Sequence, residues 1–144
     1  MRGRTIQELE VGDQAESSKT ISESDIYGFA GITGDFNPAH VNEEYARGTF
    51  FKGRIAHGML VGGLVSAVLA MQLPGPGAIY VRQSFEFKAP VRIGDTVTAR
   101  VEVVAVDREK NRVQIRTNCT NQTGALVLDG EALLSPTKRK PRSA

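Results

Sequence analysis

The sequence has no tryptophan, a single cysteine and only two histidines in 144 residues. Cys119 has no partner for a disulfide within the chain, and the few Cys and His residues do not cluster at the spacing of a zinc site. We therefore expect a protein of a reducing compartment, the cytoplasm, with no structural metal.

Long apolar runs are also missing. The longest stretch without a charged residue, 55–81, is interrupted by glycines and by Pro74 and Pro76. Its apolar part is shorter than the roughly 20 residues that a membrane span requires. The N-terminal residues 1–13 contain no apolar segment of the kind found in secretory signals. We expect neither membrane insertion nor secretion.

The chain has no strong charge of one sign in its main part. Its formal net charge is +2, but Lys138, Arg139, Lys140 and Arg142 lie within the last seven residues, and removing these four charges leaves the rest at −2. A body of this charge does not favour nucleic acid as a partner. We predict a single domain over residues 1–135, followed by a basic, disordered tail over 136–144.

The first half of the sequence predicts short helices and a turn. Ser22 and Asp25 resemble a capping box that opens a helix of about three turns, which Gly31 and Gly34 weaken and end. Residues 34–38, GDFNP, are typical of a turn. This places Asp35 and His40 on an irregular loop, followed by a short helix over 43–47.

The second half predicts one buried helix and a set of strands. Residues 58–71 are apolar on every face, which indicates a buried helix. The segments 78–88, 95–109, 111–121 and 125–135 are alternating or β-branched, and a further strand is expected near 13–20. We predict an α+β fold in which an antiparallel β-meander wraps around one central helix.

The two histidines lie in segments that are poorly suited to core packing. An aspartate is ionised at neutral pH, and a histidine can take or give a proton there. Asp35 and His40 therefore have the chemistry to hold and activate one water molecule, and the free N–H groups at the start of the apolar helix could stabilise an oxyanion. The spacing by itself is equally compatible with structural roles for both residues.

Several motifs, in the same order along the chain, resemble a known family. Residues 29–40 read FAGITGDFNPAH, residues 54–60 read RIAHGML, and residues 72–80 read QLPGPGAIY; QSFEFKAPV and IGDTV follow. These motifs are similar to those of the MaoC-like hydratases, especially the short (R)-specific 2-enoyl-CoA hydratases. The resemblance extends from about Leu9 to Ser135.

This resemblance implies a hot-dog fold, a sheet wrapped around a long helix, in a homodimer or higher homo-oligomer. It assigns Asp35 and His40 as the catalytic pair, the Gly58 N–H as the oxyanion donor, and Ser66 as a helix residue near the active site. The implied reaction is reversible syn hydration of trans-2-enoyl-CoA to (R)-3-hydroxyacyl-CoA, without cofactor or metal. The implied partner is a small-molecule acyl-CoA.

Other assignments depend on single residues. The phosphates of coenzyme A should meet basic groups, for which Lys52, Arg54, Arg82 and Lys88 are candidates. His57, at the start of the apolar helix, is expected to be structural. Three alternatives stay open: an acyl thioesterase, a 3-hydroxyacyl-ACP dehydratase on the same fold, and a non-catalytic module that binds acyl thioesters.

Overall fold

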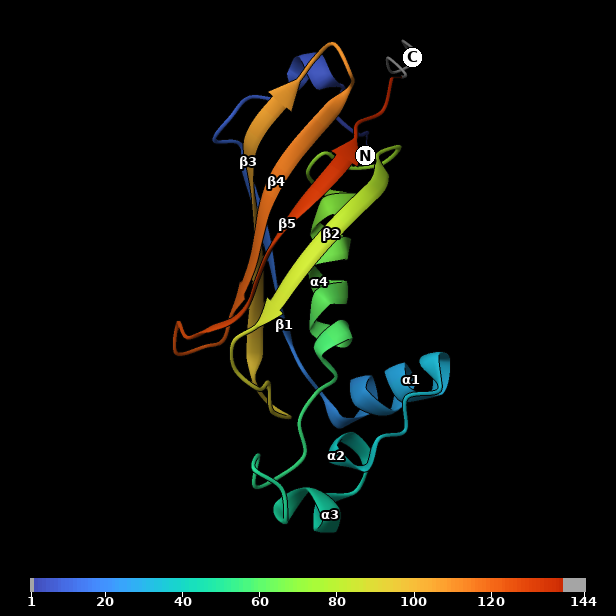
Figure 1. Cartoon of the computed structure of the whole chain (residues 1–144), viewed down its shortest axis with the longest axis vertical. Helices are drawn as coiled ribbons and strands as arrows, with labels where there is room; N and C mark the ends of the chain where they lie inside the picture. The colour runs from blue at the N-terminus through green and yellow to red at the C-terminus, as the bar shows by residue number, and fades with distance from the viewer. Residues whose placement is uncertain (1, 139–144) are drawn as a thin grey trace.

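A five-stranded sheet with one long helix packed along it forms the main body of the molecule (Figure 1). The computed structural model describes residues 2–138. Its elements are η1 (Ile6–Glu8), β1 (Gln14–Thr20), α1 (Glu23–Thr33), α2 (Pro38–Val41), α3 (Glu43–Arg47), α4 (Gly58–Met71), β2 (Ile79–Phe87), β3 (Thr96–Asp107), β4 (Arg112–Thr120) and β5 (Leu126–Ser135). The predicted α+β architecture, a sheet around a central helix, is confirmed.

The sheet is antiparallel throughout, and its strand order is β1-β3-β4-β5-β2. Only β3, β4 and β5 form a meander, so the prediction that all four later strands follow one another is wrong for β2. Eight residues including Pro90 connect β2 to β3, too many for a tight hairpin. Strand β2 instead pairs with β5, where Gly130 leaves room for the Ser84 carbonyl: a Cβ on Gly130 would lie 1.9 Å from that oxygen.

The core lies between α4 and one face of the sheet. Strands β3 and β4 alternate buried with less buried residues, as the sequence pattern predicts for a sheet with one covered face. Val61, Val65, Val68 and Leu69 are the buried apolar side chains that α4 contributes. The helix is not enclosed on every side, however, because Met59 is 59% exposed and Met71 is 55% exposed.

The helices α1, α2 and α3 lie together at one end of the sheet (Figure 1). Helix α1 begins with the predicted capping box: the Asp25 N–H donates to Ser22 Oγ at 3.1 Å, and the Ser22 N–H donates to Asp25 Oδ2 at 2.9 Å. Gly34 ends the helix with φ +81°, a conformation that suits glycine. Gly31 does not end it.

The start of the predicted tail is attached to the body. The Asn111 Nδ2 donates to the Pro136 carbonyl at 2.9 Å. The rest of the predicted tail, from Arg139 to Ala144, lies outside the described residues. In the part of the chain that the structure describes, no helix is long and apolar enough to cross a membrane.

Candidate active site

Asp35 lies in the short connection between α1 and α2, as the turn residues predict. Its N–H donates to Thr33 Oγ1 at 3.2 Å, and its own carboxylate Oδ1 accepts from the Asn37 N–H at 3.2 Å. Such Asx turns hold the backbone in place without regular structure. The side chain is solvent-exposed, and its second oxygen, Oδ2, has no hydrogen-bond donor among residues 2–138.

His40 does not lie on an irregular loop; it belongs to the single turn of helix α2. The prediction missed this turn because the segment is only four residues long. Pro38 at its first position has φ already set for a helix, and the Asn37 side chain caps it by accepting from the Ala39 N–H at 3.0 Å.

The His40 ring is fixed by the segment that precedes α4. Its Nδ1 lies 2.8 Å from the Ile55 carbonyl, and the Ile55 N–H donates to the Ala39 carbonyl at 3.2 Å. A carbonyl oxygen can only accept, so Nδ1 carries the hydrogen. In neutral His40 the other nitrogen, Nε2, is therefore an unprotonated acceptor.

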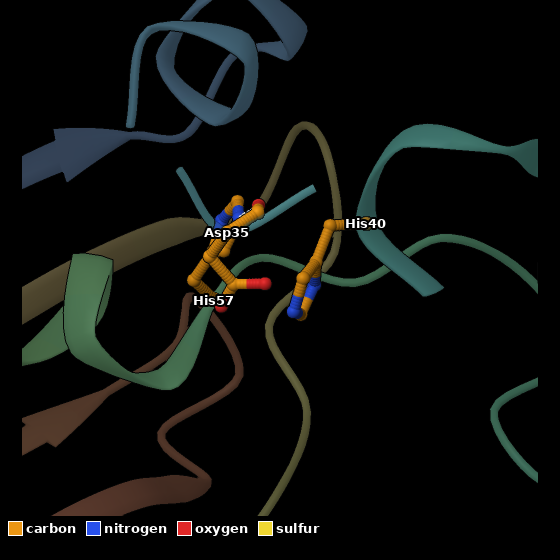
Figure 2. Close-up of side chains that lie close together, drawn as sticks. All are labelled: Asp35, His40 and His57. Carbon is orange, nitrogen blue, oxygen red and sulfur yellow. Dashed lines mark hydrogen bonds between the residues drawn. The ribbon is translucent and has the colours of Figure 1, made fainter. Parts of the chain in front are cut away.

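A third residue, His57, lies directly against this pair. One side-chain ligand atom from each of Asp35, His40 and His57 can be chosen so that all three lie within 4.8 Å of one another. Figure 2 shows the Asp35 carboxylate turned toward the His40 ring, with His57 beside it and joined to Asp35 by a hydrogen bond. The sequence reasoning missed this contact, although His57 is the only other histidine in the chain.

Gly58 is the first residue of α4, which provides a backbone donor beside this group. Among residues 2–138 its N–H has no hydrogen-bond acceptor, as expected at a helix start, where the helix dipole also favours negative charge. Glycine leaves room for a close contact, since a Cβ here would lie 2.7 Å from the Phe87 ring.

Asp35, His57 and Gly58 line a cavity of about 550 Å³. Most of its other walls are apolar: they include Phe50, Phe51, Met59, Phe87, Val91 and Val127. A mostly apolar cavity with one carboxylate and one free amide is suited to an apolar chain that carries a single polar reacting group.

Ser66 lines a second hollow, of about 380 Å³, with Gly62, Tyr80 and Phe85. Met59 lines both cavities, so they adjoin, but Ser66 does not line the cavity of Asp35. Burial raises the pKa of Tyr80 to about 12, which keeps its hydroxyl neutral. The active-site role of Ser66 stays a prediction.

The four basic candidates lie in different surroundings. Lys88 lines the Asp35 cavity and pairs with Glu86 at 2.5 Å, which raises the Lys88 pKa. Lys52 lies on the nearby loop with φ +61°. Arg82 lines the second hollow. The structure therefore brings only Lys88 to the wall of the Asp35 cavity.

Arg54 is already occupied by partners within the chain. Its side chain is 11% exposed and pairs with Glu23 at 2.5 Å and Glu43 at 3.4 Å, and it also donates to the Tyr27 hydroxyl at 3.1 Å. The hydrogen bond from Arg54 lowers the Glu23 pKa. These contacts join α1 and α3 to the segment before α4.

Within residues 2–138, only Asp35, His40 and His57 form a group of side chains whose ligand atoms lie close enough together to hold a metal ion. Two of the four ring nitrogens are already bonded to carbonyl oxygens. The two rings are stacked, with an interplanar angle of 30°.

Comparisons with known proteins give consistent results. The MaoC like domain family matches residues 7–124. An (R)-specific enoyl-CoA hydratase of Rhodospirillum rubrum is 61% identical over 127 residues, which are 88% of this chain and 88% of that protein. The unliganded R-hydratase PhaJ1 of Pseudomonas aeruginosa has a TM-score of 0.88 and 42% identity, covering 99% of this chain and 97% of that chain. The (R)-hydratase of A. caviae involved in PHA biosynthesis has a TM-score of 0.87 and 44% identity, covering 90% of this chain and 98% of that chain.

Proposed function

The chain belongs to the MaoC-like family, and we propose that it is an (R)-specific enoyl-CoA hydratase in which Asp35 and His40 activate the water. As a hydro-lyase it adds water reversibly to a trans-2-enoyl thioester and gives the (R)-3-hydroxyacyl product. The observation that carries the assignment of residues is that Asp35 and the free Gly58 N–H line one apolar cavity, and that a side-chain nitrogen of His40 lies within 4.8 Å of the Asp35 carboxylate.

The spacing of the pair fits one bound water. A water that makes two hydrogen bonds of about 2.8 Å bridges groups somewhat less than 5 Å apart, and one carboxylate oxygen of Asp35 lies within 4.8 Å of one ring nitrogen of His40. Asp35 Oδ2 accepts one hydrogen of this water and orients it. Neutral His40 accepts the other hydrogen at Nε2, because its Nδ1–H is held by the Ile55 carbonyl.

The reaction then needs no further proton source. The water oxygen bonds to C3, its proton passes to His40 Nε2, and the electrons of the C2–C3 double bond move onto the thioester oxygen. The Gly58 N–H stabilises that enolate oxygen. His40 Nε2 next gives the proton to C2 and becomes neutral again. Because one residue takes and returns the proton on one side of the substrate, both additions occur on the same face, which is syn hydration.

For the coenzyme A part we propose Lys88 as a phosphate or pantetheine contact, since its side chain is 43% exposed and lines the cavity. Lys52, next in the chain to Phe51 of the cavity wall, is a second candidate. We do not propose this role for Arg54 and Arg82, since Arg54 is paired within the chain and Arg82 lines another hollow.

We also propose that two copies form a homodimer along β2. This strand is at the edge of the sheet, with no neighbour on its outer side within residues 2–138. Its exposed apolar residues include Ile79 at 66% and Val81 at 47%, and Met59 of α4 lines the second hollow together with Val81. An unpaired apolar edge is otherwise prone to aggregation. A second copy would cover both the edge and the exposed side of α4.

Light scattering tests the dimer. The wild type should have twice the chain mass of 15.6 kDa. Val81→Asp should shift it toward the monomer, and Glu102→Asp, at a partly buried position on the far side of the sheet, should not. A wild-type mass of one chain would contradict the proposal.

We further propose a cytoplasmic location and one domain over residues 1–135. The single cysteine supports the location, and the one continuous core supports the single domain.

The activity is tested by incubating the protein with crotonyl-CoA. We expect reversible loss of the enoyl absorbance with no release of free thiol. Thiol release with the enoyl group intact would indicate a thioesterase. Binding without any conversion would indicate a non-catalytic module. Comparing crotonyl-CoA with the same acyl group on acyl carrier protein separates the coenzyme A enzyme from the carrier-protein dehydratase.

A further inference from the structure

His57 is a buried polar residue that the proposed reaction does not use. It is 2% exposed, immediately precedes Gly58, and lines the cavity. Although it is the N-cap residue of α4, its side chain does not cap the helix. Its carbonyl accepts the first bonds of the helix, from Leu60 and Val61, so the ring is left free for other contacts.

The ring instead bonds to the backbone of Asp35. His57 Nε2 lies 2.9 Å from the Asp35 carbonyl oxygen. Because the carbonyl can only accept, Nε2 carries the hydrogen. Asp35 otherwise lies on an exposed turn that is held by local contacts from Thr33 and Asn37. Within residues 2–138, the bond from His57 is thus the side-chain hydrogen bond that ties the Asp35 backbone to the start of α4.

The same ring also supports His40. The His40 and His57 ring centroids are 3.9 Å apart with an interplanar angle of 30°, which is a stacked arrangement. Phe29 contacts His57 with a centroid distance of 4.7 Å. One side chain therefore touches both members of the catalytic pair, Asp35 by a hydrogen bond and His40 by its face (Figure 2).

The second nitrogen of the ring shows that packing alone does not explain a histidine here. His57 Nδ1 is buried and has no hydrogen-bond partner among the described residues. With the hydrogen on Nε2, this nitrogen is a desolvated acceptor, which an apolar side chain of the same size would avoid. The feature that a histidine adds, and phenylalanine does not, is the N–H that reaches Asp35.

We propose that His57 is a positioning residue, which in its Nε2–H tautomer holds the Asp35 backbone and stacks on His40 so that the two catalytic side chains face one water. This inference rests on the proposed function, in which Asp35 and His40 act as a pair. The His57 ring does not itself exchange a proton with the substrate.

Two substitutions separate the hydrogen bond from the ring. His57→Gln keeps an N–H at about the position of Nε2, and His57→Phe keeps a stacking ring without the donor. A small misplacement of catalytic groups can lower turnover by about 100-fold. We expect kcat with crotonyl-CoA to fall by roughly 10- to 100-fold in His57→Phe and by less than about 5-fold in His57→Gln. Equal losses in the two variants would overturn the proposed hydrogen-bond role.

A double-mutant cycle separates positioning from loss of folded protein. If His57 acts through the pair, His57→Phe should cost little further activity in a His40→Gln background, because the effects of residues that act as a unit do not add. Val65→Ala is the matched control, since Val65 is buried in α4, the helix that His57 precedes, and does not line the cavity. Its loss should be the same in both backgrounds. If kcat of the double variant instead falls by the product of the losses in His57→Phe and His40→Gln, the proposal is overturned.

Nitrogen NMR of the histidine rings gives a readout that does not depend on activity. With only two histidines, the ring signals are assigned from the two single variants. We expect neutral His57 as the Nε2–H tautomer and neutral His40 as the Nδ1–H tautomer. The opposite tautomer for His57 would overturn the inference. If the tautomers are as expected and the wild type does not hydrate crotonyl-CoA, the proposed function fails and the geometry stands.

Discussion

The sheet with α4 and the helical end, residues 22–57, are held together by different forces. The sheet and α4 share a continuous apolar core in which Leu69, Val101 and Ile115 are fully buried. The helical end contributes only a few side chains to this core, among them Ile26 and Ala56, and otherwise relies on capping bonds, on Arg54 and on His57. The first region sets the stability of the fold, and the second sets the geometry of the catalytic pair.

This difference has a physical reason. Packing of apolar side chains is non-directional and tolerates small shifts, whereas hydrogen bonds fix the direction of one group relative to another. Asp35, Asn37 and His40 are each fixed by at least one such bond, on a segment of only six residues. Substitutions in the helical end should therefore lower turnover more than stability, and substitutions in the core should do the reverse.

The largest effect is expected from the catalytic pair. Asp35→Asn and His40→Gln should each lower kcat by about two or more orders of magnitude, in line with the contribution of general acid–base groups. The melting temperature should change little, because Asp35 is exposed and His40 is only partly buried. Steady-state kinetics and thermal denaturation check both parts. Turnover near that of the wild type in either variant would show that the pair is not catalytic.

The corresponding effect in the core is on stability. Leu69→Ala removes a fully buried side chain of α4 and should lower the free energy of unfolding by about 2–5 kcal/mol. Urea denaturation measures this loss, and kcat per folded molecule should stay within about threefold of the wild type. A loss of turnover as large as that of His40→Gln, with unchanged stability, would contradict the division between the two regions.

Arg54 connects the helical end to the segment before α4, so its substitution should show an intermediate effect. Its own side chain is 11% exposed, but Glu23 and Glu43 are 52% and 45% exposed, and solvent screens their charges. Arg54→Gln should lower stability by about 1 kcal/mol. Because the network carries no substrate contact in the proposed mechanism, KM for crotonyl-CoA should stay unchanged; a several-fold rise in KM would instead support contact with the coenzyme A phosphates.

The smallest effect concerns the start of α1 and depends on pH. The backbone N–H of Ser22 is the main cause that lowers the Asp25 pKa, and Lys19 contributes. A carboxylate with a lowered folded pKa stabilises the protein above its unfolded pKa of about 3.9, and this contribution is lost as the pH falls through the lower folded value. Asp25→Asn should cost about 0.5–1 kcal/mol at pH 7.

Denaturation of the wild type and of Asp25→Asn at several pH values measures this contribution. The difference between the two proteins should be constant near neutral pH and should shrink toward zero in acid. A difference that grows in acid would show that the Asp25 charge does not stabilise α1 in the way the capping box suggests.

The two regions also differ in how well the sequence predicts them. The apolar pattern of 58–71 and the alternation of the later strands are strong periodic signals, and α4 and β2–β5 lie where these signals predict. The place of β2 beside β5 was not predictable, because strand order depends on contacts between distant residues such as Phe85 and Gly130. The resemblance to a family predicted the hot-dog fold, which the related solved structures confirm.

In the helical end, sequence reasoning identified the residues but not their arrangement. The turn chemistry of 34–38 placed Asp35 correctly and missed the helical turn that carries His40, since one turn has no periodicity to detect. The contact of His57 with the pair joins residues 22 and 17 positions apart, and no local pattern encodes such a contact. Only the small number of histidines pointed to it.

The stereochemistry of hydration in deuterium oxide tests the central claim most directly. If the water between Asp35 and His40 adds from one face, hydrating crotonyl-CoA should give a 3-hydroxy product that an (R)-specific dehydrogenase oxidises completely and an (S)-specific one does not. The deuterium at C2 should lie on the same face as the hydroxyl. An (S) product, or deuterium on the opposite face, would contradict the account.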